Sequence, residues 1–68
     1  SAGVSQNDTV TFTGGPVYKS STAARATTTK NASTCKVTAI NEKGTHPYHC
    51  ISQDGKGVYG WVDKEDVK

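Results

Sequence analysis

Four side chains in the second half of the chain are of the types that bind zinc. They are Cys35, His46, His49 and Cys50. Structural zinc sites take cysteine and histidine at spacings such as C-x2-C or H-x3-H, and neither spacing occurs here. Successive side chains of a strand point to opposite faces, so His49 and Cys50 cannot easily share one ion. We interpret all four as ordinary strand residues and expect no metal or other cofactor.

The same geometry disfavours nucleophilic catalysis by a cysteine–histidine pair. Such a pair must meet within hydrogen-bond distance and be oriented by a third group. His49 and Cys50 are neighbours in the chain, but a strand directs their side chains apart. The sequence therefore predicts a domain that is not itself an enzyme.

The two cysteines are also the candidates for a disulfide. In the strand register that the sequence favours, Cys35 and Cys50 are diagonal neighbours on one face. Diagonal neighbours lie about 7–8 Å apart, whereas disulfide-bonded cysteines have Cβ atoms about 4 Å apart. We predict two free thiols, as suits a protein made in a reducing cytosol.

Aromatic side chains are the remaining candidates for binding chemistry, and two of them fall on the same side of one expected strand near the end of the chain. Residues 58–67, VYGWVDKEDV, alternate small or apolar residues with Tyr59 and Trp61. This is the period of a strand with both faces occupied. The strand should end at Asp63, because that residue and a second aspartate three positions on have the spacing of a helix cap. A single turn would then fold the last residues back.

Earlier segments show the same alternation. Thr9–Thr13 places Val10 and Phe12 on one face, and a Gly-Gly-Pro sequence ends this segment. The other segments expected to be extended are Val17–Tyr18, Cys35–Asn41 and Pro47–Ser52. Turn-forming residues follow the last two, which predicts two hairpins. The many threonines and valines favour strands, so the sequence predicts an all-β fold, a small antiparallel barrel.

The segment from Lys19 to Thr34 is the least regular part of the chain. It contains no aromatic residue and no Leu, Ile or Val, and its run of threonines disfavours helix. We predict a long ordered loop, in which a cap at 20–22 could start at most one turn of helix. Structureless loops beyond about 12–15 residues are uncommon in compact domains and are usually functional or disordered. A solvated surface arm and a wall of a ligand site are supported about equally.

Antiparallel pairing of these strands assigns residues to the core. We expect Val37 and Ala39 to point inward, opposite Cys50 and Tyr48 respectively.

The same pairing places aromatic and apolar residues on the outer face of the closing hairpin, in which Pro47–Ser52 pairs with the strand in residues 58–67. His49 lies opposite Trp61, and Ile51 lies opposite Tyr59. Apolar and aromatic groups on the solvent side of a small sheet indicate either that the long loop covers them or that they bind something. For Trp61 we favour partial cover by the loop, because large aromatics are seldom left bare.

Length, charge and hydropathy indicate which classes of function the sequence supports. The 68 residues form one domain with a small core. The net charge of +2 arises without any run of lysine or arginine, so nucleic-acid binding has little support. No apolar stretch approaches the roughly 20 residues of a membrane span, and we expect no membrane insertion. Residues 1–7 are small, polar and aperiodic, as expected of a linker remnant, which leaves 8–68 as the domain.

Four blocks of the chain resemble, in order, the bacterial SH3-like (SH3b) domains. The blocks are GGPVYKSSTAA (14–24), STCKVTAI (33–40), HPYHCIS (46–52) and VYGWVDKEDV (58–67). In particular, the chain is similar to the C-terminal cell-wall-binding modules of N-acetylmuramoyl-L-alanine amidase endolysins from phages of Gram-positive, especially clostridial, hosts. The Gly-Trp-Val triplet followed by an acidic turn is the most specific feature. One departure is Cys50, where similar sequences carry Leu or another aliphatic residue.

The resemblance implies a partly open barrel of roughly five to seven strands, with Lys19–Thr34 as a long arm (an RT-type loop) beside the binding surface. It also implies a non-catalytic module that binds peptidoglycan through the stem peptide or the cross-bridge. Such a module tethers an upstream catalytic domain, for example a peptidoglycan amidase, to the wall. The protein would be made in the bacterial cytoplasm and act at the cell wall.

Six residues are the candidates for the binding site. Those expected to form its apolar walls are Tyr18, Tyr59 and Trp61. Those expected at its rim, where they would meet peptide amides, are His46, Tyr48 and His49. The period of its strand, however, points Tyr48 toward the core.

Two other functions remain open. One is a protein-interaction module that binds a proline-rich or extended peptide in an aromatic groove. The absence of Asp and Glu from Lys19–Thr34 counts against it. The other is a self-standing enzyme, which an assay of wall hydrolysis would separate from wall binding.

Overall fold

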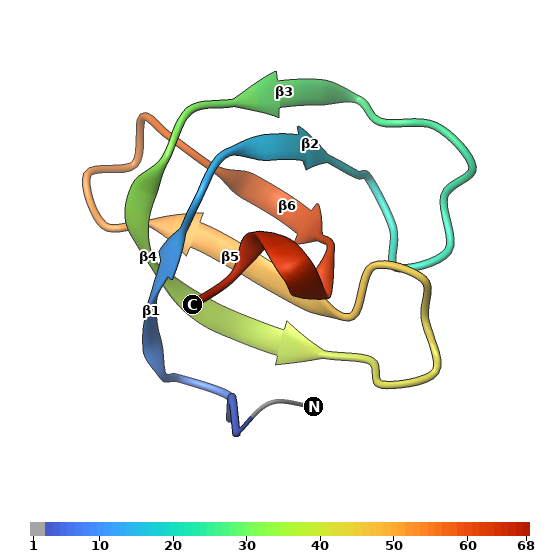
Figure 1. Ribbon diagram of the computed structural model, residues 1–68, viewed down its shortest axis with the longest axis horizontal. Helices are drawn as coiled ribbons and strands as arrows, with labels where there is room; N and C mark the ends of the chain where they lie inside the picture. Colours follow the sequence, from blue (N-terminus) through green and yellow to red (C-terminus); the bar gives the residue numbers. More distant parts are fainter. Residues whose placement is uncertain (1–2) are drawn as a thin grey trace.

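A computed structural model describes residues 3–68 and contains six strands and one short 3-10 helix (Figure 1). The strands are β1 (Thr9–Phe12), β2 (Gly15–Val17), β3 (Thr28–Lys30), β4 (Ser33–Ile40), β5 (Tyr48–Ser52) and β6 (Tyr59–Val62). The helix, η1, spans Lys64–Asp66. None of the helical structure in the described residues is long and apolar enough to cross a membrane.

The strands form two antiparallel sheets. The larger has the order β1-β4-β5-β6, and the smaller is the β2-β3 hairpin. In the β5–β6 pair, His49 lies opposite Trp61 and Ile51 opposite Tyr59, so the register predicted for the closing hairpin is confirmed.

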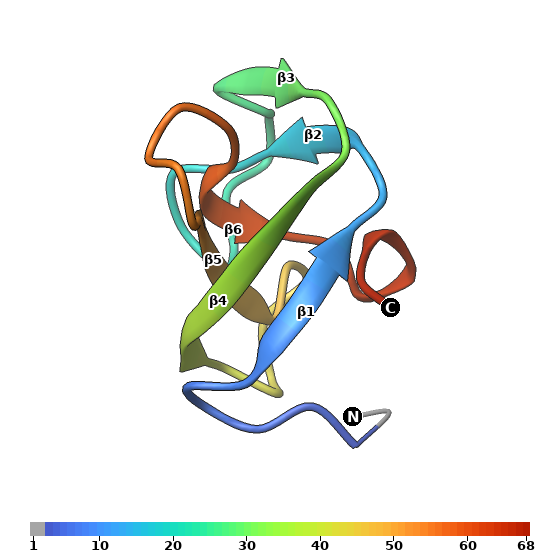
Figure 2. The same ribbon diagram turned by 90° about the vertical axis from the view of Figure 1, so that its left-hand side faces the viewer.

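Backbone hydrogen bonds beyond these sheets curl the chain toward a barrel (Figures 1 and 2). Tyr18, directly after β2, exchanges two bonds of 2.7 and 2.9 Å with Trp61 of β6. At the other edge, Thr11 of β1 exchanges bonds of 3.0 and 2.9 Å with Lys68, just past η1. The predicted all-β, SH3-like fold with a partly open antiparallel barrel is confirmed.

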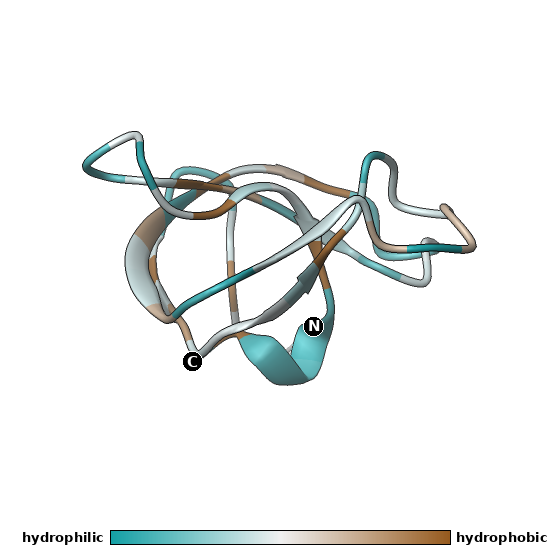
Figure 3. Ribbon diagram, turned by 90° about the horizontal axis from the view of Figure 1, so that it is seen from above, coloured by the Kyte–Doolittle hydropathy of each residue, from teal (hydrophilic) through white to brown (hydrophobic). Residues whose placement is uncertain are grey.

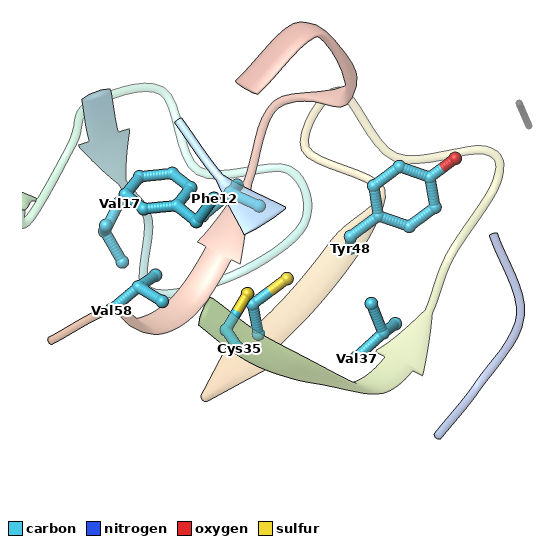
Figure 4. Close-up of a cluster of buried hydrophobic side chains, with 8 residues drawn as sticks. Phe12, Val17, Cys35, Val37, Tyr48 and Val58 are labelled. Atoms are coloured by element: carbon cyan, nitrogen blue, oxygen red, sulfur yellow. The ribbon is translucent and has the colours of Figure 1, made fainter. Parts of the chain in front are cut away.

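The core lies between the two sheets and is built from residues at alternating strand positions (Figure 4). Its buried members are Phe12, Val17, Cys35, Val37, Tyr48, Cys50, Val58 and Val62. The polar helix η1 lies at the surface, where Figure 3 shows it at the hydrophilic end of the colour scale. Val4 also packs against this core. Assignment of 1–7 as a linker stays a prediction, and residues 1 and 2 lie outside the described part of the chain.

The arm is more regular than the sequence predicts. Instead of one loop over Lys19–Thr34, Thr28–Lys30 forms β3 against β2, and β4 already begins at Ser33. The reason is that β-branched threonine, which disfavours helix, fits an extended strand equally well. The helical turn that a cap at 20–22 could start does not form.

The register predicted for the β4–β5 pair is wrong beyond Val37, because β4 has a β-bulge at Thr38. Val37 lies opposite Cys50 as predicted, but Ala39 lies opposite His49 rather than Tyr48, which pairs with Ile40. The Thr38 hydroxyl donates to the His49 carbonyl oxygen at 3.2 Å. The additional residue on β4 shifts the remainder of that strand by one position.

The turn after β6 forms where predicted, but without the predicted cap. η1 begins at Lys64, and Val67 bridges back to Phe12 of β1. The Asp63 side chain makes no capping hydrogen bond, because its carboxylate is bonded to His46.

Both cysteines are buried free thiols, as predicted, and they are diagonal neighbours across β4 and β5. Burial, with a smaller contribution from Cys35, raises the pKa of the Cys50 thiol to about 12, and burial also raises the pKa of Cys35. Thiolates are the reactive form. A thiol reagent at pH 7.5 should therefore find no rapidly reacting group in the folded domain and two after denaturation without reductant. Detection of none in denatured monomer would establish a disulfide instead.

Candidate functional site

The site is built around the contact between Tyr18 and β6. Gly60 has φ +146°, and a Cβ placed there would lie 2.7 Å from Val17 Cγ1 and 2.8 Å from the Tyr18 carbonyl oxygen. Both separations are well inside van der Waals contact, so only glycine allows the Tyr18 backbone to pair with Trp61 at this distance. The Gly-Trp dipeptide therefore holds the start of the arm against the main sheet.

A cavity of about 280 Å³ opens between the arm and the outer face of β6. Its lining residues are Val17, Tyr18, Lys19, Thr27, Thr28, His49, Tyr59 and Gly60. Apolar and aromatic groups form most of this surface, with a few polar groups among them, which is the usual composition of a small-ligand site. Tyr59 is 69% exposed and is the one large hydrophobic side chain among the described residues that is left open to solvent.

His49 lies at the centre of an aromatic cluster on the outer face of the sheet. Its ring makes edge-to-face contacts with Tyr59 and Trp61, at centroid separations of 5.7 and 5.3 Å. Thr38 Oγ1 lies 2.6 Å from His49 Nδ1. The same hydroxyl lies 3.2 Å from the His49 carbonyl oxygen. Nε2 has no hydrogen-bond partner among the described residues, and it accepts or donates according to the tautomer of the ring.

Desolvation lowers the pKa of His49 below its ordinary 6.5. The neutral ring is favoured in the folded state, so the stability that His49 contributes is fully present above pH 6.5. That contribution declines as the pH falls below 6.5 toward the folded-state pKa, because only the unfolded chain gains the proton. We expect the His49 ring protons to titrate by NMR with a midpoint below 6.5. A midpoint at or above 6.5 would contradict this environment.

The stability difference between wild type and His49→Gln provides a second measurement of the same effect. The difference in unfolding free energy, measured by urea denaturation, should decrease between pH 7 and pH 5. The reason is that the glutamine variant lacks the pH-dependent contribution of the His49 ring. Subtracting the variant removes the effect of every other titrating group that the two proteins share.

His46 is not at the rim of the cavity, where the sequence predicts it. It is 5% exposed and lies behind Tyr18, with the two rings stacked at a centroid separation of 3.3 Å. Its Nδ1 is bonded to the Asp63 carboxylate, and its Nε2 lies 2.9 Å from the Ala23 carbonyl oxygen. His46 therefore ties the arm to the end of β6 and supports Tyr18 from behind.

Tyr48 is also not at the rim. Its ring is 1% exposed and belongs to the core, and its hydroxyl has no hydrogen-bond partner among the described residues. Strand period explains this outcome, because Tyr48 shares its face with Cys50 and Ser52, which are both buried.

The remaining candidates are brought together. Tyr18, His49 and Tyr59 line the cavity, while Trp61 contacts His49 but does not line it. Desolvation, and then the carboxylates of Asp63, Asp66 and Glu65, raise the pKa of the Tyr18 hydroxyl. The phenol is therefore a neutral hydrogen-bonding group.

Sequence reasoning missed the lining residues that belong to the arm, which are Lys19, Thr27 and Thr28. The only signal for them is the length of the arm, which favours a ligand wall as much as a solvated loop. Their positions depend on the β2–β3 pairing, in which Thr28 lies opposite Val17.

A second cavity, of about 410 Å³, lies between the β3–β4 connection and the turn before β6. It contains Lys30, Lys56 and Asp54 but no aromatic side chain. Hydrogen bonds from the Lys56 backbone and the Ser52 hydroxyl lower the pKa of Asp54. This carboxylate is thus engaged by its own turn, and the cavity offers a ligand no apolar wall.

No group of three His, Cys, Asp or Glu side chains in residues 3–68 is placed to hold a metal ion. His49 and Cys50 lie on opposite faces of β5, with Cys50 in the core. The arrangement offers a small apolar cavity with a few hydrogen-bonding groups.

Comparison with known families gives one match. The model of the GW (Gly-Tryp) dipeptide domain matches residues 1–68. No curated protein and no solved structure matches the chain. Gly60 and Trp61, which bring the arm against β6, form the one Gly-Trp dipeptide in the sequence.

Proposed function

Because the chain belongs to the GW (Gly-Tryp) dipeptide domain family, whose members are generally non-catalytic modules that bind the bacterial cell wall, we propose that this domain binds peptidoglycan through the stem peptide or the cross-bridge. The observation that carries the proposal is the cavity beside the Gly-Trp dipeptide. Tyr18 and Tyr59 supply its aromatic surface, and His49 and two threonines supply hydrogen-bonding groups.

A peptide suits this cavity better than a long glycan does. The volume of about 280 Å³ is at the small end of ligand sites, which are commonly about 300–1,000 Å³. Such a space accommodates one or two small residues. Hydroxyl groups and the free Nε2 of His49 are suited to peptide N–H and C=O groups.

We further propose that the domain tethers a hydrolase to the wall, as in the phage endolysins that the sequence resembles. A module of modest affinity is sufficient for this purpose, because attachment raises the effective concentration of a linked enzyme at its substrate. An upstream N-acetylmuramoyl-L-alanine amidase is the partner that this resemblance favours. The protein would be made in the bacterial cytoplasm, where free thiols persist, and would act at the cell wall.

The alternative is a module that binds a proline-rich or extended peptide of a partner protein. The exposed ring of Tyr59 near Tyr18 favours it, since aromatic grooves bind polyproline helices. The lining residues include no carboxylate for a basic flank of such a peptide. Titration with a PxxP peptide would test this alternative, and binding tighter than to wall fragments would establish it.

Sedimentation with purified Gram-positive cell walls tests the leading proposal. The domain should pellet with the walls, and the turbidity of the same suspension should stay constant because the domain cleaves nothing. A domain that stays in the supernatant would contradict wall binding, and a fall in turbidity would contradict a purely binding role.

A further inference from the structure

We propose that the cavity between the arm and β6 is selective for the free carboxylate end of a short peptide with small apolar side chains. The inference rests on the proposed wall binding and specifies it further. An uncross-linked peptide end would be preferred over one whose terminal carboxyl group is an amide.

The charge of the cavity comes from one side chain. Lys19 is the only lysine, arginine, aspartate or glutamate among the residues that line the cavity. Its ammonium group forms no ion pair in the described part of the chain, where the single ion pair is between His46 and Asp63. After desolvation, the carboxylates of Asp63, Asp66 and Glu65 raise the pKa of Tyr18, but none of the three lines the cavity. That of Asp63 is bonded to His46. A cation without a partner at the rim of an apolar cavity favours an anionic ligand.

His49 lines the cavity as a neutral ring. Its lowered pKa keeps the ring neutral at pH 7, so Lys19 provides the positive charge of the cavity. The unpartnered Nε2 offers a hydrogen bond to a peptide group, as acceptor or donor according to the ring tautomer. His49 and Lys19 thus offer complementary contacts to the two kinds of group at a peptide terminus: a backbone amide and a carboxylate.

The cavity is small and mostly apolar. The volume of about 280 Å³ and the Val17, Tyr18 and Tyr59 surfaces leave room for alanine-sized side chains. A phosphate diester or a sugar chain would match the charge or the hydroxyl groups, but not the apolar walls.

Fluorescence of Trp61, which contacts His49, provides a readout for binding. The probe is N-acetyl-D-alanyl-D-alanine, and its C-terminal amide is the matched neutral control. Because Lys19 is exposed, its contribution is that of a solvent-accessible ion pair, and the acid should bind about three- to fivefold more tightly than the amide at low salt. The preference should decrease as salt is added.

Two lysine variants assign the preference to the cavity. Lys19→Gln should bind acid and amide equally. Lys43→Gln, which removes an exposed charge in the β4–β5 turn that does not line the cavity, should retain the preference. Equal binding of acid and amide by wild type would overturn the inference, as would an acid preference that survives in Lys19→Gln.

Wall sedimentation separates failure of this inference from failure of the proposed function. If the domain pellets with walls but binds neither dipeptide, the carboxylate inference is wrong and the wall-binding proposal stands. If it binds neither dipeptide nor walls, both are wrong. If it binds the acid through Lys19 but does not pellet with walls, the selectivity of the cavity stands and its assignment to the wall is wrong.

Discussion

Replacing Gly60 with alanine is expected to cost about 3–5 kcal/mol of folding free energy, from overpacking and backbone strain together. The new Cβ would meet Val17 Cγ1 at 2.7 Å and the Tyr18 carbonyl oxygen at 2.8 Å, in a backbone conformation with φ +146°. Neither neighbour can move easily, because Val17 is in the core and the Tyr18 carbonyl is bonded to Trp61. A domain of this length is stable by roughly 3–10 kcal/mol, so much of the variant should be unfolded.

Gly55→Ala is the matched control for this prediction. Gly55 also has positive φ, +71°, but nothing lies within 4 Å of a Cβ built there. That variant should lose only the conformational cost, about 1–2 kcal/mol. Urea denaturation followed by circular dichroism measures both changes. Equal losses in the two variants would mean that the close contact between Tyr18 and β6 is not what requires glycine.

The result bears on why the Gly-Trp dipeptide marks this family. Trp61 contributes backbone groups that pair with Tyr18, and Gly60 removes the side chain that would keep the two segments apart. The dipeptide is then first a structural device that fixes one wall of the cavity. Its effect on binding follows from that placement.

The closing hairpin shows how far strand period predicts this fold. Alternation in Tyr48–Ser52 and Tyr59–Val62 determines which residues face the core, and turn residues determine the register between the strands. The pairing of His49 with Trp61 follows from these local rules. The same rules fail at Thr38, because a bulge adds one residue at a place that no local pattern marks.

The arm and the cavity show what local rules cannot predict. Whether Thr28–Lys30 is loop or strand depends on β2, which lies more than ten residues earlier in the chain. His46 is a polar residue that sequence alone assigns to the surface, yet a carboxylate and a carbonyl oxygen allow its burial. Aromatic alternation identifies Tyr59, but Lys19 joins it only through the fold of the arm.

Tyr59→Ala is expected to weaken wall binding by about 1–3 kcal/mol, as for a central aromatic contact, with little change in folding stability. Its ring is 69% exposed and lines the cavity, whereas Trp61 is partly buried and does not. Truncation of Trp61 therefore confounds binding with packing, and Tyr59 gives the cleaner test. Binding isotherms to purified walls, corrected for the folded fraction from circular dichroism, measure the loss.

Two further variants determine what the Tyr59 result means. Tyr59→Phe keeps the ring and should retain most of the affinity if the apolar wall is what binds. Ile51 lies directly opposite Tyr59 on the same face of the sheet, but it lines a different cavity. The Ile51→Ala variant should therefore bind walls like the parent. If Ile51→Ala loses affinity while a folded Tyr59→Ala does not, the ligand lies along the β4–β5 side of the sheet and not under the arm. A loss in both variants would mean that the ligand spans the whole outer face, because the two side chains are cross-strand neighbours and a single small residue in the cavity could not reach both.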